Sequence, residues 1–314
     1  MLLVRQVGAR LMESMSKVIE GKPEVVRTTV TVFFAGGHLL IEDVPGVGKT
    51  MLAKALARSI DASVRRIQFT PDLLPSDVTG VSVFNQDVRR FEFRPGAIFA
   101  NVVVGDEINR ASPKTQSAML ESMEELQVTV DGTTYPLDRP FIIMATQNPI
   151  EMEGTYPLPE AQRDRFMARI SMGYPPARSE MAMLEHHGAH SPLEDLTPVT
   201  DAETVRQVLT AVTRVHASPA IQQYIVDLAT RSRTTSALRL GASPRASLHL
   251  LRAARAHAAL EGRDHVLPDD VQMLAAAVLS HRLTPSSETQ LARRTTTDVV
   301  ADLLRQVPVP ATAR

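Results

Sequence analysis

The sequence predicts an α/β fold in which a mostly parallel sheet has helices on both faces and is followed by an all-helical domain. Four short apolar runs between residues 38 and 146 alternate with helical or loop segments, which is the order of elements typical of a parallel sheet covered by helices. Beyond residue 175 the β-type runs stop, and stretches rich in Ala, Leu and Arg dominate. We therefore expect one domain over residues 1–175 and a second over residues 176–314.

The composition limits the classes of function. The 34 Lys and Arg residues balance 35 Asp and Glu residues, so the net charge of -1 provides no overall attraction to nucleic acid or anionic lipid. The absence of Cys excludes disulfides and thiolate metal sites. Aromatic residues make up only 4%, which argues against a stacking surface for single-stranded nucleic acid. Without a secretory start or a run of about eighteen apolar residues, we expect a cytoplasmic protein with no stable membrane insertion.

The first elements are helical. From residue 3 to about residue 32 the apolar positions recur at helical spacing, and residues 21–23 (Gly-Lys-Pro) interrupt them. The first strand is HLLIED, which is followed by the turn VPGVG and then by KTMLAKALARSI, a segment with the composition of a helix. The chain therefore begins with two helices and a strand, loop and helix unit.

The remaining elements of the first domain follow the same alternation. We expect strands at VRRIQF, ANVVVGD and PFIIMAT, and a clear helix over residues 113–125. The segment VTVDGTTYPL contains an Asp131-Gly132 turn between alternating residues, which predicts a β-hairpin.

Four helices are expected in the second domain, over residues 205–215, 221–231, 243–260 and 268–279. Asp269 and Asp270 fall in the first turn of the last of these helices, and His281 and Arg282 follow its end. Charges placed in this way favour the helix dipole.

The strongest chemical signal is IEDVPGVGKT, because it lies between a predicted strand and a predicted helix. Such a loop presents backbone N–H groups to a phosphate, while its lysine reaches the β- and γ-phosphates and its Thr hydroxyl is offered to Mg²⁺. One departure from the usual pattern is that Asp43 stands at the first glycine position. The predicted nucleotide-binding residues are Pro45, Gly46, Val47, Gly48, Lys49, Thr50 and Met51.

Two adjacent carboxylates, Asp106 and Glu107, close the apolar strand ANVVVGD. A carboxylate at this end of a strand beside a phosphate loop can hold Mg²⁺ through water, and its neighbour can deprotonate an attacking water. We assign the metal to Asp106 together with Thr50, and the catalytic base to Glu107. The sequence therefore predicts a P-loop ATPase that uses ATP and Mg²⁺.

Two long stretches, FRPGAIFANVVVGDEINRASPKTQSAMLESMEELQVTVDG and ATQNPIEMEGTYPLPEAQRDRF, closely resemble MoxR ATPases of the AAA+ superfamily. The second domain matches more loosely through GASPRA and GRDHVLPDDV. The resemblance implies an AAA+ nucleotide-binding domain with a helical lid, and a homo-hexameric ring with ATP between neighbours. It also implies a partner with a von Willebrand factor A domain and roles in maturing other proteins or inserting metal into them.

The resemblance assigns further residues. Asn148 matches the sensor that positions the attacking water, and Arg165 matches the arginine finger that reaches a neighbour's γ-phosphate, with Arg163 as the alternative. Arg245 matches a second sensor, which would clamp phosphate and link lid angle to nucleotide state. Arg252 and Arg255 lie on the same predicted helix as Arg245, so a merely basic helix face is the alternative there. Arg110 is close to the carboxylate pair and stays unassigned.

The expected function is ATP-driven, chaperone-like remodelling of a protein client. An ATPase subunit of a metal chelatase and a slowly hydrolysing nucleotide switch that acts as a scaffold are the alternatives, and a DNA-remodelling helicase fits the neutral charge less well. The insertion over residues 78–96 and the Asp131-Gly132 hairpin match surface elements of the family that could contact a client.

Overall fold

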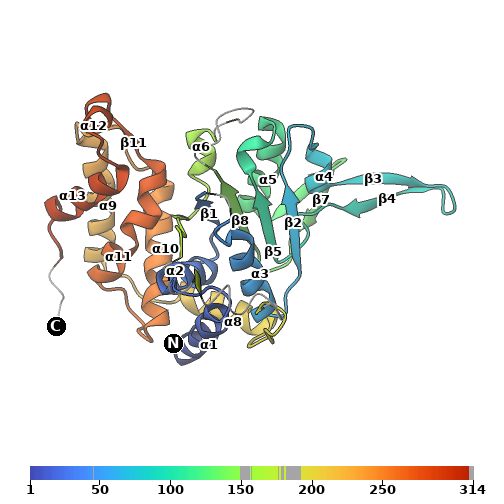
Figure 1. Cartoon of the computed structure of the whole chain (residues 1–314), viewed down its shortest axis with the longest axis horizontal. Helices are drawn as coiled ribbons and strands as arrows, with labels where there is room; N and C mark the ends of the chain where they lie inside the picture. Colours follow the sequence, from blue (N-terminus) through green and yellow to red (C-terminus); the bar gives the residue numbers. More distant parts are fainter. Residues whose placement is uncertain are drawn as a thin grey trace.

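The computed structural model describes residues 1–44, 46–148, 156, 158–175, 177, 180–181 and 192–310. A central sheet with its helices adjoins a group of helices formed by the C-terminal part of the chain, and a two-stranded hairpin projects from the far side (Figure 1). Among the helices in these ranges, none is long and apolar enough to cross a bilayer.

Five parallel strands form the central sheet, in the spatial order β2-β5-β8-β1-β9. All four predicted strands are confirmed, and a short fifth strand at the edge was not predicted because its three residues are too few for a recognisable pattern. The strands are β1 (Leu39–Glu42), β2 (Val64–Gln68), β5 (Val102–Asp106), β8 (Ile142–Gln147) and β9 (Ala168–Ile170).

The predicted helices of the first domain are also confirmed. The helix over residues 113–125 begins after Ser112, whose hydroxyl accepts the Thr115 N–H, and Pro113 occupies its first position. The helices in this part are α1 (Leu2–Ser16), α2 (Pro23–Phe34), α3 (Lys49–Ser59), α4 (Pro75–Thr79), η1 (Ile108–Arg110), α5 (Pro113–Glu125) and α6 (Glu160–Arg163).

Alternate residues of the central strands pack into two separate cores. Leu39 and Ile41 lie in a core that includes residues of α1, α2 and α3, whereas Leu40 lies in the core that holds Met119 and Leu120 of α5. All five side chains are at most 1% exposed. Successive side chains of a strand point to opposite faces, so a sheet covered by helices on both faces needs this uninterrupted apolar pattern.

The C-terminal part is helical, as predicted, but it is not entirely so. A short ribbon pairs β10 (Leu238–Leu240) with β11 (Thr284–Pro285), two segments that are too short to give a strand signal in the sequence. Ser218 and Ser243 cap α9 and α10, and a proline follows each of them. The helices are α8 (Ala202–Thr213), α9 (Pro219–Thr234), α10 (Pro244–Leu260), α11 (Pro268–Leu279), η2 (Ser280–Arg282), α12 (Ser287–Leu291) and α13 (Thr296–Gln306).

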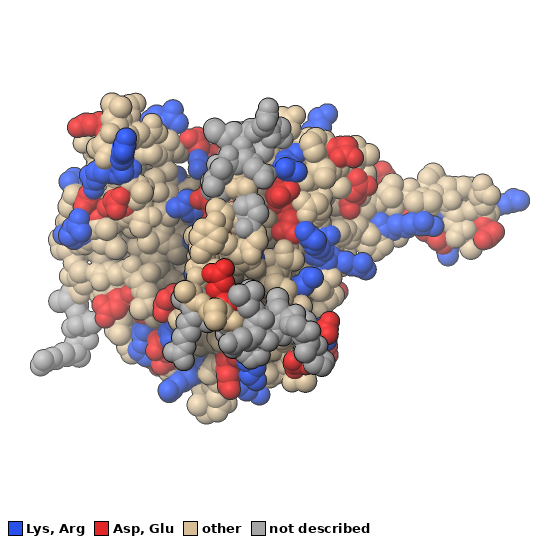
Figure 2. All heavy atoms as spheres, viewed as in Figure 1, with Lys and Arg blue, Asp and Glu red and all other residues tan. Residues whose placement is uncertain are grey.

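Two antiparallel hairpins extend from the sheet domain. Strands β6 (Gln127–Val130) and β7 (Thr133–Pro136) form the predicted hairpin, and both turn residues, Asp131 and Gly132, have positive φ. The insertion over residues 78–96 forms a second hairpin from β3 (Gly80–Asn85) and β4 (Arg90–Pro95), which projects from the molecule in Figures 1 and 2.

The expected dipole role of His281 is wrong. Burial, followed by the nearby Arg282, lowers the pKa of His281 well below its usual value, so this imidazole is neutral at the end of α11. Arg282 does serve the helix end, because its Nη1 donates to the Val278 carbonyl at 2.5 Å. Its Nε also donates to Asp164 at 2.9 Å, which ties the helical part to the segment before β9.

His38 joins the beginning of β1 to two neighbouring elements. Its Nδ1 accepts the N–H of Ile143 in β8, and its Nε2–H donates to the Met123 carbonyl in α5, both at 3.0 Å. Burial lowers the pKa of His38 to about 4, although the hydrogen bond to Met123 opposes this shift. The folded protein therefore holds His38 in its neutral form.

This neutral histidine predicts acid sensitivity. As the pH falls from about 6.5 to about 4, the unfolded chain gains a proton at His38 that the folded chain does not, so His38 alone should lower the free energy of unfolding by about 3 kcal/mol. Urea unfolding across this range should show a shallower pH dependence for His38→Gln. His265→Gln, which changes an exposed histidine, should keep the wild-type dependence. Equal slopes for His38→Gln and the wild type would contradict a neutral, buried His38.

Candidate functional site

The predicted phosphate loop lies between β1 and α3, at the carboxyl end of the sheet. Gly46 and Gly48 have φ values of 84° and 90°, which favour glycine, and no atom lies within 4 Å of a Cβ placed on Gly46. The α3 helix begins at Lys49 without a side-chain cap, so its first N–H groups can receive an anion. Lys49 Nζ donates to the Asp43 carbonyl at 2.7 Å.

Other predicted loop residues serve packing as well as binding. Val47 and Met51 are half-buried and contact the core that includes α1 to α3. Pro45 lies outside the described residues.

Asp43, which replaces the usual first glycine, clamps the loop from outside. Its carboxylate accepts the Gly173 N–H at 2.6 Å, the Ser171 hydroxyl at 2.9 Å and the Val44 N–H at 2.8 Å. Burial raises the pKa of Asp43, but these hydrogen bonds outweigh burial and hold the pKa below its usual value. The departure from the glycine pattern thus connects the phosphate loop to the segment after β9.

The Asp106 carboxylate accepts hydrogen bonds from three side chains. Thr50 Oγ1 and Arg66 Nε donate to Asp106 Oδ2 at 3.2 and 2.6 Å, and Thr146 Oγ1 donates to Oδ1 at 3.2 Å. The Asp106 side chain is only 8% exposed, so these contacts fix its orientation. The two residues predicted to hold the metal therefore lie in direct contact.

Glu107 adopts the left-handed conformation, with φ 58° and ψ 49°. This backbone is strained for a glutamate, and the Glu107 N–H, which donates to Thr146 Oγ1 at 3.0 Å, helps to hold it. Gln68 Nε2 donates to Glu107 Oε2 at 3.0 Å, and Arg110 Nε lies 3.4 Å from the same oxygen. The turn separates the Glu107 carboxylate from that of Asp106 and exposes about one third of it.

Asn148 follows β8, the strand next to β5, and is buried at the same carboxyl end of the sheet. The structure thus brings together the loop, the carboxylate pair and the predicted sensor. Sequence reasoning missed Arg66, Gln68 and Thr146. The predicted strand VRRIQF could have indicated two of them, because Arg66 and Gln68 are two residues apart and their side chains therefore lie on the same face of the strand.

Arg165 and Arg245 lie near the other end of the sheet. Arg245 Nη2 donates to Glu124 Oε1 at 2.5 Å, and Arg165 Nε lies 3.9 Å from Glu124 Oε2. Glu124 is at the end of α5, next to Met123. His38, the residue before β1, hydrogen-bonds to the Met123 carbonyl, so Glu124 lies near the amino end of β1. We predicted that Arg245 clamps phosphate, and within this chain its guanidinium contacts the carboxylates of Glu124 and Asp164.

The alternative arginines occupy different positions. Arg110 is beside Glu107, whereas Arg163 ends α6 and has a buried Nε without a hydrogen-bond partner. In the described part of the chain, no group of three or more His, Asp or Glu residues could hold a metal ion.

Comparison with known proteins gives the same picture. Residues 38–168 match the ATPase family associated with various cellular activities (AAA), and residues 230–303 match the AAA lid domain. The chain is 40% identical to Chaperone MoxR1 of Mycobacterium tuberculosis, over 87% of this chain and 74% of that protein. This chain belongs to the MoxR family of AAA+ ATPases. The family assignment made from the two long motifs is therefore confirmed.

Two further similarities extend over nearly the whole MoxR-family chain. It is 48% identical to the uncharacterized protein YeaC of Bacillus subtilis, over 96% of this chain and 94% of that protein. A crystal structure from Cytophaga hutchinsonii superposes with a TM-score of 0.91 at 37% identity, covering 98% of this chain and 96% of that one. The nucleotide-binding fold and the helical lid are thus shared with a solved structure.

The Asp43 clamp leads to a prediction that separates packing from binding. Asp43→Gly restores the usual glycine, so nucleotide affinity should stay close to that of the wild type. The protein should lose about 2 kcal/mol of stability, because three hydrogen bonds to a carboxylate are removed. Thermal unfolding and fluorescent-nucleotide titration measure the two effects. The stability of Asp43→Asn should lie between that of the wild type and that of Asp43→Gly. A large loss of affinity with unchanged stability would show that Asp43 acts on the nucleotide directly.

Proposed function

We propose that this MoxR-family chain hydrolyses ATP with Mg²⁺ at the site between β1, β5 and β8. The observation that carries the proposal is the hydrogen bond between Thr50 and Asp106, because it joins the phosphate loop to the carboxylate pair at the end of β5. The open space at Gly46 and the uncapped start of α3 fit a bound phosphate chain. These features support a nucleoside triphosphate as the substrate.

Each residue of the site has a chemical role in this proposal. Lys49 would leave the Asp43 carbonyl to bind the β- and γ-phosphates, and Thr50 and Asp106 would hold Mg²⁺ directly and through water. The ion would supply charge neutralisation on the phosphates. Glu107 would take the proton of the attacking water, and the amide of Asn148 would orient that water without adding charge.

Arg165 and Arg245 would act on the nucleotide of a neighbouring subunit. Both lie near the amino ends of the strands, whereas the phosphate loop lies at the carboxyl ends, so one subunit presents its loop where the next presents its arginines. Such head-to-tail contacts close into a ring when the rotation permits, and the family resemblance supports a homo-hexamer. The loose 3.9 Å contact of Arg165 with Glu124 leaves this guanidinium able to reorient.

The work done by hydrolysis would be chaperone-like remodelling of a protein client in the cytoplasm. A relative named Chaperone MoxR1 supports this class of activity, and the resemblance supports a von Willebrand factor A domain protein as partner and metal insertion as one outcome. The projecting β3–β4 hairpin carries Phe91, whose side chain is 72% exposed, and is our candidate for contact with the client. Nucleic acid is not an expected partner.

Substitutions in the loop and at the base should separate binding from turnover. Lys49→Ala should abolish ATP binding, whereas Glu107→Gln should keep binding and slow turnover by a factor of about 10² to 10⁴, because only the proton acceptor is lost. Nucleotide titration and steady-state phosphate release are the measurements. Glu121→Gln, at an exposed position of α5, is the matched control and should leave both unchanged. Normal turnover in Glu107→Gln would remove Glu107 from the role of base.

The trans-acting arginine makes a complementation prediction. Arg165→Ala should bind nucleotide almost normally yet lose turnover by a factor of about 10³ to 10⁵, because the charge that develops on the γ-phosphate loses its partner. Mixing it with Lys49→Ala should restore part of the activity, since some boundaries then join an intact loop to an intact arginine. The measurement is ATPase rate against mixing ratio, after mass analysis confirms subunit exchange.

A matched control uses the double variant Lys49→Ala/Arg165→Ala in place of Lys49→Ala. This mixture has no boundary with both groups and should stay inactive. If the first mixture also stays inactive despite exchange, Arg165 does not act in trans, and Arg163 and Arg110 become the residues to test.

A further inference from the structure

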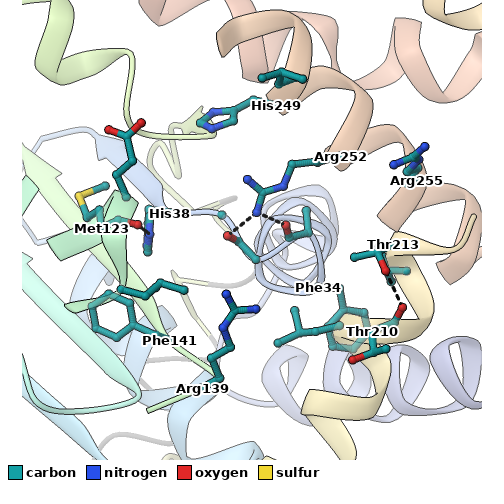
Figure 3. Close-up of a pocket in the computed structure, with 18 of the residues that line it drawn as sticks. Phe34, His38, Met123, Arg139, Phe141, Thr210, Thr213, His249, Arg252 and Arg255 are labelled. Carbon is teal, nitrogen blue, oxygen red and sulfur yellow. Dashed lines mark hydrogen bonds between the residues drawn. The ribbon is translucent and has the colours of Figure 1, made fainter. Parts of the chain in front are cut away.

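A cleft of about 580 Å³ lies between the sheet domain and the helical part, away from the phosphate loop. Its walls come from the segment before β1, the end of α5, the segment before β8, and helices α8 and α10 (Figure 3). This volume is within the range of small-molecule sites in proteins. The proposed ATP hydrolysis gives a role to two of its six arginines, Arg165 and Arg245, and none to the other four.

The charge of the cleft is strongly one-sided. Among the described residues that line it, Glu124 is the only acid, and Arg165 and Arg245 already contact this carboxylate. The two lining histidines add no negative charge. The six arginines that line the cleft are Arg139, Arg165, Arg206, Arg245, Arg252 and Arg255.

Three of these arginines have no carboxylate partner within the described parts of the chain. Arg252 Nη2 donates only to the carbonyls of Ala35 and Gly36, at 2.8 and 2.9 Å. Burial lowers the pKa of Arg252, and the charge of Arg139 lowers it further, although its surface remains accessible from the cleft. The Nε of Arg255 is buried and has no hydrogen-bond partner.

Two arginines that are more buried than Arg139 and Arg252 do have acidic partners. Arg282 is paired with Asp164, and Arg263 is paired with Asp270, at 2.9 and 2.6 Å. The guanidiniums of Arg139 and Arg252 are both open to the cleft, and two neighbouring positive charges without an acid repel each other. In Figure 3, Arg139 and Arg252 extend into the cleft from opposite walls, where an anion between them would relieve their repulsion.

The residue types identify the class of anion. Every basic group in the lining is Arg and none is Lys, which favours planar, bidentate recognition of phosphate oxygens. His249 adds a neutral donor, because its Nδ1 accepts from Arg282 at 2.6 Å and its proton therefore lies on Nε2. Phe34, Phe141 and Leu209 give the cleft apolar walls. A cleft of this volume suits a compact ligand better than a polymer.

We propose that this cleft binds a small compound with several phosphate groups, such as a nucleoside polyphosphate, through Arg139, Arg252 and Arg255. The site is separate from the phosphate loop of the same chain. Arg139 comes from the segment before β8, whereas Arg252 and Arg255 come from α10. A bound oligophosphate therefore links the lid helix to the sheet domain and stabilises their present arrangement.

The test uses Lys49→Ala as the background, so that the phosphate loop does not contribute. Inorganic tripolyphosphate, without Mg²⁺, should bind with a stoichiometry of one per chain by calorimetry and raise the melting temperature. Adding Arg139→Ala or Arg255→Ala should weaken binding about ten- to hundredfold each, because bidentate contacts to a charged group are lost. Arg139→Lys should retain part of the affinity. Arg10→Ala, at an exposed position of α1, is the matched control and should change nothing.

Further arms identify the ligand. If ADP binds more tightly than tripolyphosphate and depends on Arg139 in the same way, the apolar walls contact a base. If the two compounds bind equally, the site recognises the phosphates alone. Arg252 is left intact because it also holds the Ala35 and Gly36 carbonyls.

Four outcomes would overturn the proposal, and three of them concern tripolyphosphate. These are no binding of tripolyphosphate, binding that ignores Arg139 and Arg255, and binding that occurs only in assembled rings and depends on Arg165 and Arg245, which would assign the anion to the neighbour's nucleotide. Binding of an acidic peptide but not of tripolyphosphate would also overturn it. Because the background has no functional loop, failure here leaves the proposed hydrolysis untouched.

Discussion

The parallel register of β1, β8 and β5 is the constraint on which the rest of the structure depends. Glu42 pairs with Gln147, and Gly105 pairs with Ala145, so the three strands end at one edge of the sheet. The phosphate loop, Asp106 and Asn148 therefore lie at the same edge of the sheet. The register is strongly specified because both faces of these strands are buried, and a shift of one residue would exchange the two cores.

The sheet also separates two kinds of group. Its carboxyl edge carries the uncapped start of α3, which suits an anion, whereas the region near its amino edge carries arginines from α10 and from the segment before β9. Both features come from one chain, yet they cannot meet within it. This separation is the physical basis for proposing that neighbouring subunits complete each other's sites.

The distribution of charge is as important as its sum. A net charge of -1 and the interspersed acidic and basic side chains on the face shown in Figure 2 suggest no special affinity for anions. The cleft nevertheless concentrates six arginines around one carboxylate. Positions spaced by seven and three residues along α10 place Arg245, Arg252 and Arg255 toward this cleft. The basic residues of α10 therefore line a concave surface that stays open to solvent at Arg252.

The sequence by itself determined the elements whose signals are local. These are the four longer strands of the central sheet, the helix over residues 113–125, the Asp131-Gly132 turn and the phosphate loop, since periodicity and turn chemistry depend only on near neighbours. Tertiary structure alone decided which residues surround Asp106 and Glu107, that Asp43 clamps the loop, that His281 is neutral, and that Arg245 lies with Glu124. Each of these depends on contacts between segments more than thirty residues apart, where burial and charge are set by the packing of the whole chain.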